Sequence, residues 1–305
     1  MALKIIHTKN LKWIDIVNPD DKDLLYLKEN FKFHPLDFED LVMPSIRVRI
    51  DEYSEYHFIV MLLPILNRES EEIKPVEVDF FVGKDYLITI HDGSMRTLTN
   101  LAHSVQQYDN VRAQYMQQGP GLLLSSLLEL LFKRSSPILD KLNQDAAGAG
   151  RNIFSSDINT LEQLSRLKKN IIIARRIMKM HRYVLGKLAR SKKDYLQFKD
   201  SSTYFQDLIE YAENIWEVLS ADKESVESFE ETNQSLAAHR MNDTLRTLTV
   251  FSVIIFILTL FINVLLFIES ISKIANWEYL LPATLFSLAF ITLVMLIYFK
   301  TRKWL

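Results

Sequence analysis

The sequence contains no cysteine, which excludes disulfides, zinc–thiolate sites and thiol catalysis. It has only 7 Gly and 8 Pro in 305 residues, a composition that favours long uninterrupted helices over a turn-rich β fold. It also lacks glycine-rich phosphate-binding loops, a G-x-S-x-G turn and an H-E-x-x-H zinc motif. We therefore expect neither an ATP-driven pump nor a hydrolase, and we predict no enzymatic activity.

The sequence also lacks a strong excess of either charge. Its 36 Lys and Arg nearly balance its 38 Asp and Glu, for a formal net charge of −2. This balance provides no electrostatic footprint for nucleic acid, and we predict no nucleic-acid partner. The N-terminal residues contain no long apolar run, so we expect no cleavable secretory signal and place most of the chain in the cytosol.

Two long apolar runs lie near the C-terminus. Residues 247–268 and residues 279–299 contain no charged side chain, and about 20 helical residues span the roughly 30 Å core of a bilayer. Trp277 and Tyr298 would place aromatic rings at the membrane interfaces. We predict two transmembrane helices, joined by an external loop at residues 269–278.

Basic residues predict the orientation of these helices. Arg240 and Arg246 precede the first run, and residues 300–305 form a basic tail after the second, whereas the loop between the runs has two acids and one lysine. Loops rich in Lys and Arg stay in the cytoplasm. We therefore predict a multi-pass protein of the plasma membrane with both termini in the cytoplasm.

Residues 1–118 mix patterns typical of strands and of short helices, which predicts a cytoplasmic α/β domain. The expected elements are helices at Asp20–Asn30 and Pro35–Val42, a strand at Tyr56–Leu66 interrupted by Pro64, and two strands around a turn within Glu77–His91.

Residues 119–200 predict a cytoplasmic helical hairpin. Leucines recur at helical spacing over Leu122–Asn143, a Gly/Ala break follows at Ala146–Gly150, and a second helix is expected over Ser156–Ala189. This second helix carries many basic residues, among them Arg175, Arg176, Lys179 and Arg182. They would form either a solvated helix face or a phosphate-binding face.

A third helix is expected to start at Ser201, because neither Pro nor Gly occurs before Ile268. At 1.5 Å per residue it would be about 100 Å long. We predict that residues 201–246 form a stalk that continues into the first membrane span. A single helix of this length needs lateral partners, which implies an oligomer.

Several short motifs occur in an order that resembles one known family. They are Trp13-Ile14-Asp15-Ile16, Phe33-His34-Pro35-Leu36 with Glu39-Asp40, Asp79 to Lys84, Gly119-Pro120, and Arg240-Met241-Asn242 before the first span. Taken together, the chain resembles the CorA superfamily of metal-ion transporters over nearly its whole length. The resemblance implies an α+β membrane fold with an N-terminal α/β domain, a stalk helix, a two-helix membrane hairpin and a homopentameric funnel.

The same resemblance implies a passive divalent-cation channel, with Mg²⁺ as the default cargo and Zn²⁺, Co²⁺ or Ni²⁺ as others. The first span would line the pore, and cytosolic metal would gate it. A regulatory ligand of the family occurs in a Tyr-Phe-x-Asp context, which matches Tyr204-Phe205-Gln206-Asp207. Asp207 is thus the implied metal ligand, with Glu210 one turn further on.

One departure from the family pattern opens an alternative. The Gly-Met-Asn motif that ends the family's pore helix is absent, and Leu266-Phe267-Ile268 occupies its place. The alternative is a non-conducting or differently selective membrane protein that acts as a metal sensor or interaction scaffold.

The first span itself carries four polar residues between Thr249 and Ile268. At 100° per residue they fall within an arc of roughly 80°, and the stripe extends toward the N-terminus. Its members are Asn242, Leu245, Thr249, Ser252, Phe256, Thr259 and Asn263. Polar groups in hydrocarbon are costly, so they would either line a pore or join adjacent helices by hydrogen bonds.

In the pore reading, Asn263 replaces the missing asparagine, and Leu245 and Phe256 form apolar constrictions. Glu269 and Glu278 would add an acidic ring at the external mouth or act as ordinary loop charges.

Overall fold

The computed structural model describes residues 3–43, 45, 47–151, 158–271 and 277–301. The chain divides into two compact units, Met1–Glu230 and Glu231–Leu305, called here the first and the second unit.

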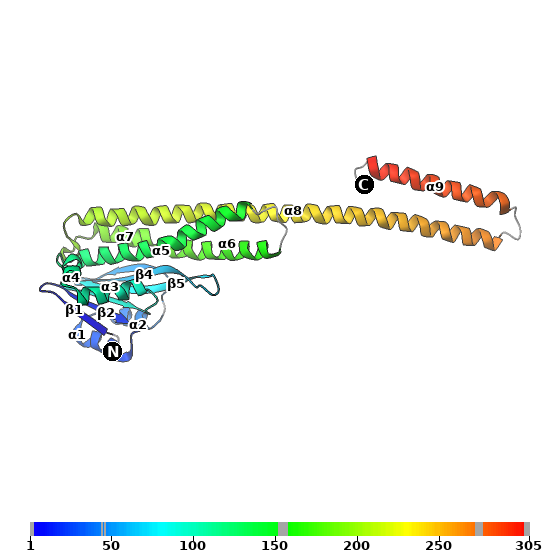
Figure 1. The fold of residues 1–305 in the computed structure, drawn as a ribbon. Helices are drawn as coiled ribbons and strands as arrows, with labels where there is room; N and C mark the ends of the chain where they lie inside the picture. The colour runs from blue at the N-terminus through cyan, green and yellow to red at the C-terminus, as the bar shows by residue number, and fades with distance from the viewer. Residues whose placement is uncertain (1–2, 44, 46, 152–157, 272–276, 302–305) are drawn as a thin grey trace. The chain divides into compact units, whose positions relative to one another are not determined.

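The first unit is built on a six-stranded sheet of order β1-β2-β6-β5-β4-β3 (Figure 1). The parallel pair is β2 with β6, and the other four pairs are antiparallel. The strands are β1 (Leu3–His7), β2 (Lys12–Val17), β3 (Arg49–Glu52), β4 (Tyr56–Leu66), β5 (Ile73–Gly83) and β6 (Tyr86–His91).

Helices cover both faces of this sheet, because its central strands bury apolar side chains on either side. One face packs against α1 (Asp21–Asn30) and α2 (Pro35–Val42) through a cluster that includes Phe38, Phe58 and Phe81. The other face packs against α5 and its neighbours in a larger core. The helices on that side are α3 (Arg96–Gln107), α4 (Asp109–Met116), α5 (Pro120–Arg151), α6 (Ile158–Met178) and α7 (His181–Arg190), followed by the short η1 (Asp194–Leu196).

The two short N-terminal helices are confirmed, and their starts follow local chemistry. Asp20 accepts a hydrogen bond from the backbone N–H of Asp23 at 2.8 Å, and the Asp23 carboxylate accepts one from the Asp20 N–H at 3.2 Å. This reciprocal cap begins α1. Pro35 occupies the first turn of α2, where the missing N–H of proline removes no helix hydrogen bond.

The expected interruption at Pro64 is wrong, since β4 continues through it to Leu66. Pro64 lies opposite Pro75 in the antiparallel pair of β4 and β5. On the other side of β4, strand β3 pairs only with residues 57–60. On the other side of β5, strand β6 pairs only with residues 78–82. Neither proline therefore removes a hydrogen bond to a third strand.

The expected Gly/Ala break at Ala146–Gly150 is also wrong, because α5 continues to Arg151. The small residues serve packing instead. A Cβ on Gly150 would lie 2.7 Å from Cζ of Phe229, and Ala146 is buried. Glycine thus lets this part of α5 approach the helix that carries Phe229.

The single helix expected over Ser156–Ala189 is in fact two helices, α6 and α7, separated by a turn at Lys179 and Met180. Residues 156 and 157 lie outside the described residues. No Gly or Pro marks the turn, and packing accounts for it. Met178 and His181 are both buried on either side of it, and His181 packs edge-on against Phe132 with ring centroids 5.3 Å apart.

Two of the four basic residues singled out on these helices contact the long C-terminal helix. The Arg175 guanidinium lies 4.9 Å from the Trp216 ring centroid and donates to Ser220 Oγ at 3.0 Å. Arg182 forms an ion pair with Glu213. Arg175 thus has a packing role, whereas Arg176, Lys179 and Arg182 are exposed, Arg182 within its ion pair to Glu213.

The long helix expected from Ser201 is confirmed as α8 (Ser201–Ile271), with 71 residues, and it is followed by α9 (Trp277–Thr301). Among the described residues, one helix is long and apolar enough to cross a membrane, Ser201–Phe267, and a shorter apolar stretch runs over Leu285–Thr301. The second membrane span, the orientation and the domain boundaries given above stay predictions.

Candidate ion pathway and metal site

The predicted polar stripe occupies one face of α8 in the second unit. All seven members, Asn242, Leu245, Thr249, Ser252, Phe256, Thr259 and Asn263, are exposed in the chain. They fall within an arc of about 100° on the helix. Leu245, Thr249, Ser252 and Phe256 also line one shallow groove along this face. The structure thus places the seven side chains together, as their spacing predicts.

The stripe faces away from α9. Figure 1 shows α9 returning beside the C-terminal part of α8, and the two helices together enclose a small cavity lined by Ile254 and Ile257 of α8 and Met295 and Phe299 of α9. Val250 lies one turn before Ile254 on α8 and is buried. The row of Val250, Ile254 and Ile257 is centred about 140° around the helix from the centre of the stripe. The stripe therefore does not join the two helices of the hairpin.

Three polar residues of the stripe donate hydrogen bonds to carbonyls within α8. Thr249 Oγ1 donates to the Leu245 carbonyl at 2.7 Å, Thr259 Oγ1 to the Ile255 carbonyl at 2.8 Å, and Asn263 Nδ2 to the Thr259 carbonyl at 2.8 Å. The hydroxyl oxygens and the Asn263 Oδ1 keep lone pairs for other partners. An oxygen-rich face of this kind suits a cation or its hydration water.

The two acids predicted at the external mouth lie near the ends of α8 and α9 that are joined by the loop. Glu269 lies in the last turns of α8 and Glu278 in the first turn of α9, but their side chains lie outside the described residues.

The predicted metal ligand Asp207 lies on α8 in the first unit, exposed at the mouth of a cavity between α8 and α5. Glu210 is exposed one turn further on and accepts a hydrogen bond from Gln206 Nε2 at 3.3 Å. Among the residues that the structure describes, no three His, Cys, Asp or Glu side chains gather in a way that could hold a metal. One copy of the chain thus supplies only part of a coordination shell at this place.

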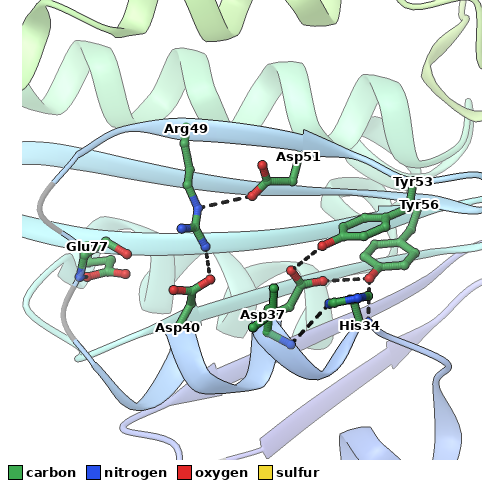
Figure 2. Close-up of polar contacts among 10 residues, drawn as sticks. His34, Asp37, Asp40, Arg49, Asp51, Tyr53, Tyr56 and Glu77 are labelled. Carbon is green, nitrogen blue, oxygen red and sulfur yellow. Dashed lines mark hydrogen bonds and ion pairs between the residues drawn. The ribbon is translucent and has the colours of Figure 1, made fainter.

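A group of polar side chains that the sequence reasoning missed lies between α2 and β3 (Figure 2). Asp37 accepts hydrogen bonds from the hydroxyls of Tyr53 at 2.8 Å and Tyr56 at 2.6 Å. Burial raises the pKa of Asp37 and outweighs these hydrogen bonds, and burial next to Asp37 raises the pKa of Tyr53 to about 12. Arg49 forms ion pairs with Asp40 and Asp51.

Two acids extend this group along β5. Burial raises the pKa of Asp79 well above its ordinary value, and the neighbouring Glu77 raises it further. Glu77 also accepts a hydrogen bond from the Ser45 backbone N–H at 2.6 Å. The sequence carries a signal for this pair, because Glu77 and Asp79 are the two charged residues in the otherwise apolar run from Val76 to Val82. Together these contacts fasten α2 and the following loop to the sheet.

The structure has an α/β unit and a 71-residue helix that is long and apolar enough to cross a membrane and carries a polar stripe. This is the arrangement expected of the class of membrane proteins that transport ions. The family model of the CorA-like Mg2+ transporter proteins matches residues 8–303. The chain belongs to this family.

Curated relatives and solved structures agree with this assignment. The putative metal ion transporter YfjQ of Bacillus subtilis is 24% identical over 300 residues, which cover 96% of this chain and 89% of that protein. The cobalt/magnesium transport protein CorA of Thermotoga maritima is 21% identical over 299 residues, covering 96% and 83%. The CorA magnesium transporter structure from Methanocaldococcus jannaschii superimposes with a TM-score of 0.75 at 19% identity, covering 98% and 94%.

These comparisons confirm the predicted family and the predicted fold class. The fold match covers the α/β unit, the long helix and the C-terminal apolar helices. The family consists of membrane-embedded metal-ion transporters, which confirms the prediction that the chain is a transporter and not an enzyme.

Proposed function

We propose that this chain assembles into a homopentamer in the plasma membrane and conducts divalent cations passively, with Mg²⁺ as its main cargo and Zn²⁺, Co²⁺ or Ni²⁺ as further cargo. The observation that carries the proposal is the polar stripe of α8, which faces away from α9 and is exposed in the single chain. Polar side chains at membrane depth need a partner other than lipid. Around a common axis, copies of the stripe would line one water-filled path.

Each part of the stripe has its own role in this path. Rings of Asn263 and Thr259 oxygens would contact the hydration shell of the ion, because Mg²⁺ gives up its water reluctantly. The Thr259 hydroxyl and one N–H of Asn263 are already bonded to α8 carbonyls, and the Thr259 oxygen and Asn263 Oδ1 keep lone pairs that can face the ion. Rings of Leu245 and Phe256 would close the path by excluding water.

Regulation would come from Asp207 and Glu210 in the first unit. Because one copy supplies too few ligands for a divalent ion, a metal held there would take further ligands from a neighbouring copy. Bound metal would neutralise carboxylates between copies and hold the assembly closed. Loss of the metal at low cytosolic concentration would restore repulsion between the carboxylates and favour opening.

A second candidate is a non-conducting or differently selective relative that acts as a metal sensor or scaffold. It is favoured by Leu266 and Phe267, which stand where the family's Gly-Met-Asn motif would fall and are exposed apolar side chains in this chain. An apolar ring at this place would not attract a hydrated cation.

Dye-reported uptake into liposomes distinguishes the two candidates. Liposomes that carry the purified protein, under a negative-inside potential and with internal metal chelated, should take up Mg²⁺ faster than empty liposomes. The same assay with Zn²⁺ and Co²⁺ identifies the preferred cargo. No uptake of any of these ions would refute conduction and favour the sensor or scaffold.

Two threonines on α8 supply a matched control. Thr249 lies in the stripe, and Thr247 lies about 160° around the helix from it; each donates its hydroxyl to the carbonyl four residues earlier. Thr249→Val should reduce flux or change the ratio of ions carried, and Thr247→Val should leave both unchanged. Equal effects of the two substitutions would contradict the assignment of the pore face.

A further inference from the structure

The cavity beside Asp207 has properties that a metal site does not need. It has a volume of about 200 Å³ and lies between α5 and α8 within the first unit. Its base is formed by Ser125, Phe132 and Leu208, all buried. The buried apolar side chains of Phe132 and Leu208 in this lining favour a ligand with a hydrophobic part rather than a bare ion.

Aromatic rings surround this base. Phe132 and Tyr211 lie edge to face with ring centroids 5.9 Å apart, and Tyr204 lines the cavity while remaining 45% exposed. The faces of aromatic rings carry negative electrostatic potential and attract weakly hydrated cations. Tyr204 and Tyr211 at the accessible part of the cavity therefore favour a positively charged organic ligand.

The charges at the mouth determine how much positive charge the cavity accepts. Lys133 Nζ lies 2.5 Å from Glu129 Oε1, so these two side chains neutralise each other. Asp207 makes no hydrogen bond or ion pair to any part of the chain that the structure describes. The three charged residues sum to −1, which matches a monovalent cation.

The volume restricts the ligand further. At roughly 30 Å³ per water molecule, the cavity holds about six or seven waters. It is smaller than the roughly 300 Å³ at which pockets for drug-sized ligands begin. A quaternary or primary ammonium compound with about seven non-hydrogen atoms matches this space.

We propose that this cavity binds a small monovalent organic ammonium ion, with the cationic group between Asp207 and the rings of Tyr204 and Tyr211. One copy of the cavity offers Mg²⁺ a single free carboxylate, so the organic cation is its better ligand when no divalent metal is shared with a neighbouring copy. The proposal does not depend on conduction, because the cavity lies wholly within the first unit.

Isothermal titration of the full-length protein in detergent, with chelator present, tests the proposal using choline as the probe. The neutral control is 3,3-dimethylbutan-1-ol, which has the shape of choline with carbon in place of the quaternary nitrogen. Choline should bind at least about tenfold more tightly than this control. Absence of choline binding, or equal affinity for the two compounds, would overturn the proposal.

Two substitutions locate the binding. Asp207→Asn should weaken choline binding about tenfold, whereas Glu210→Gln, a matched change one turn away and outside the cavity, should not. Tyr204→Leu, at a half-exposed position that carries little risk to folding, should weaken binding several-fold. Choline binding unchanged by both Asp207→Asn and Tyr204→Leu would place it elsewhere and overturn the assignment. Liposome flux, measured separately, tests conduction alone.

Discussion

The three faces of α8 should differ in their reactivity toward a water-soluble thiol reagent. Because the native chain has no cysteine, each single cysteine introduced along α8 would be the only thiol. Ser252, Thr259 and Asn263 represent the stripe, and Val250 and Ile257 represent the row that faces α9. Ile255 and Ile262, exposed in the chain but outside the stripe, represent a third face that we expect to contact lipid.

The expected size of the difference follows from the chemistry of the thiol. Methanethiosulfonate reagents react with the thiolate, and forming that charge away from water costs several kcal/mol. A cost of about 3 kcal/mol lowers the reaction rate by about two orders of magnitude, since each 1.4 kcal/mol corresponds to tenfold. Stripe cysteines should therefore react about a hundredfold faster than those facing α9 or lipid, with a period of 3.6 residues.

The assay measures the labelling rate of each variant in liposomes with a charged, membrane-impermeant reagent, followed by mass spectrometry. Labelling after denaturation checks that each thiol is reactive. If Ile255 and Ile262 cysteines react as fast as the stripe cysteines, the stripe does not face a separate water path. If labelling shows no helical period, the arrangement of α8 and α9 described above is itself contradicted.

Three further predictions concern the first unit. Asp207→Lys should alter the dependence of Mg²⁺ flux on internal metal while light scattering still reports the same oligomer, and flux with unchanged metal dependence would argue against regulation at this residue. Burial lowers the pKa of His181 to about 4, so the folded state binds fewer protons than the unfolded state between pH 4 and 6.5. The free energy of unfolding should thus fall by about 3 kcal/mol as the pH drops through this window. Denaturant unfolding followed by tryptophan fluorescence should show a weaker dependence of this free energy on pH for His181→Leu. An unchanged pH dependence would refute the assignment. Tyr56→Phe removes the hydrogen bond to Asp37 and the acceptor of the His34 N–H, which should lower the free energy of unfolding by about 1.5–3 kcal/mol. Faster hydrogen exchange in α2 is the expected result. Unchanged exchange would show that this contact does not hold the helix.

Local sequence determined those elements whose signals act over a few residues. Asp20 and Asp23 form a reciprocal cap, and Pro35 begins a helix whose first N–H groups need no partner. The absence of Gly and Pro between Ser201 and Ile268 predicted α8 nearly to its end at Ile271. The period of the polar residues predicted the stripe, because side-chain direction on a helix depends on spacing alone.

Other features depended on residues far apart in the sequence. Pro64 does not interrupt the pairing of β4, because it lies opposite Pro75 and no other strand in the described part of the chain pairs with either residue. Gly150 lies within α5 rather than ending it, and its missing side chain leaves room for the ring of Phe229. The turn between α6 and α7 has no sequence signal, because it serves the burial of His181 against Phe132.

The candidate sites show the same division. Polarity and hydrophobicity along the sequence predicted the seven stripe residues and two apolar runs, because these are properties of single residues and their spacing. Asp207 was predicted only through the resemblance of Tyr204-Phe205-Gln206-Asp207 to a family motif. Only the tertiary structure decided that α9 covers the opposite side of α8, that Asp207 adjoins an aromatic cavity, and that Asp37 and Arg49 meet between α2 and β3. These features arise where separate elements pack together, and a local pattern does not specify which faces meet.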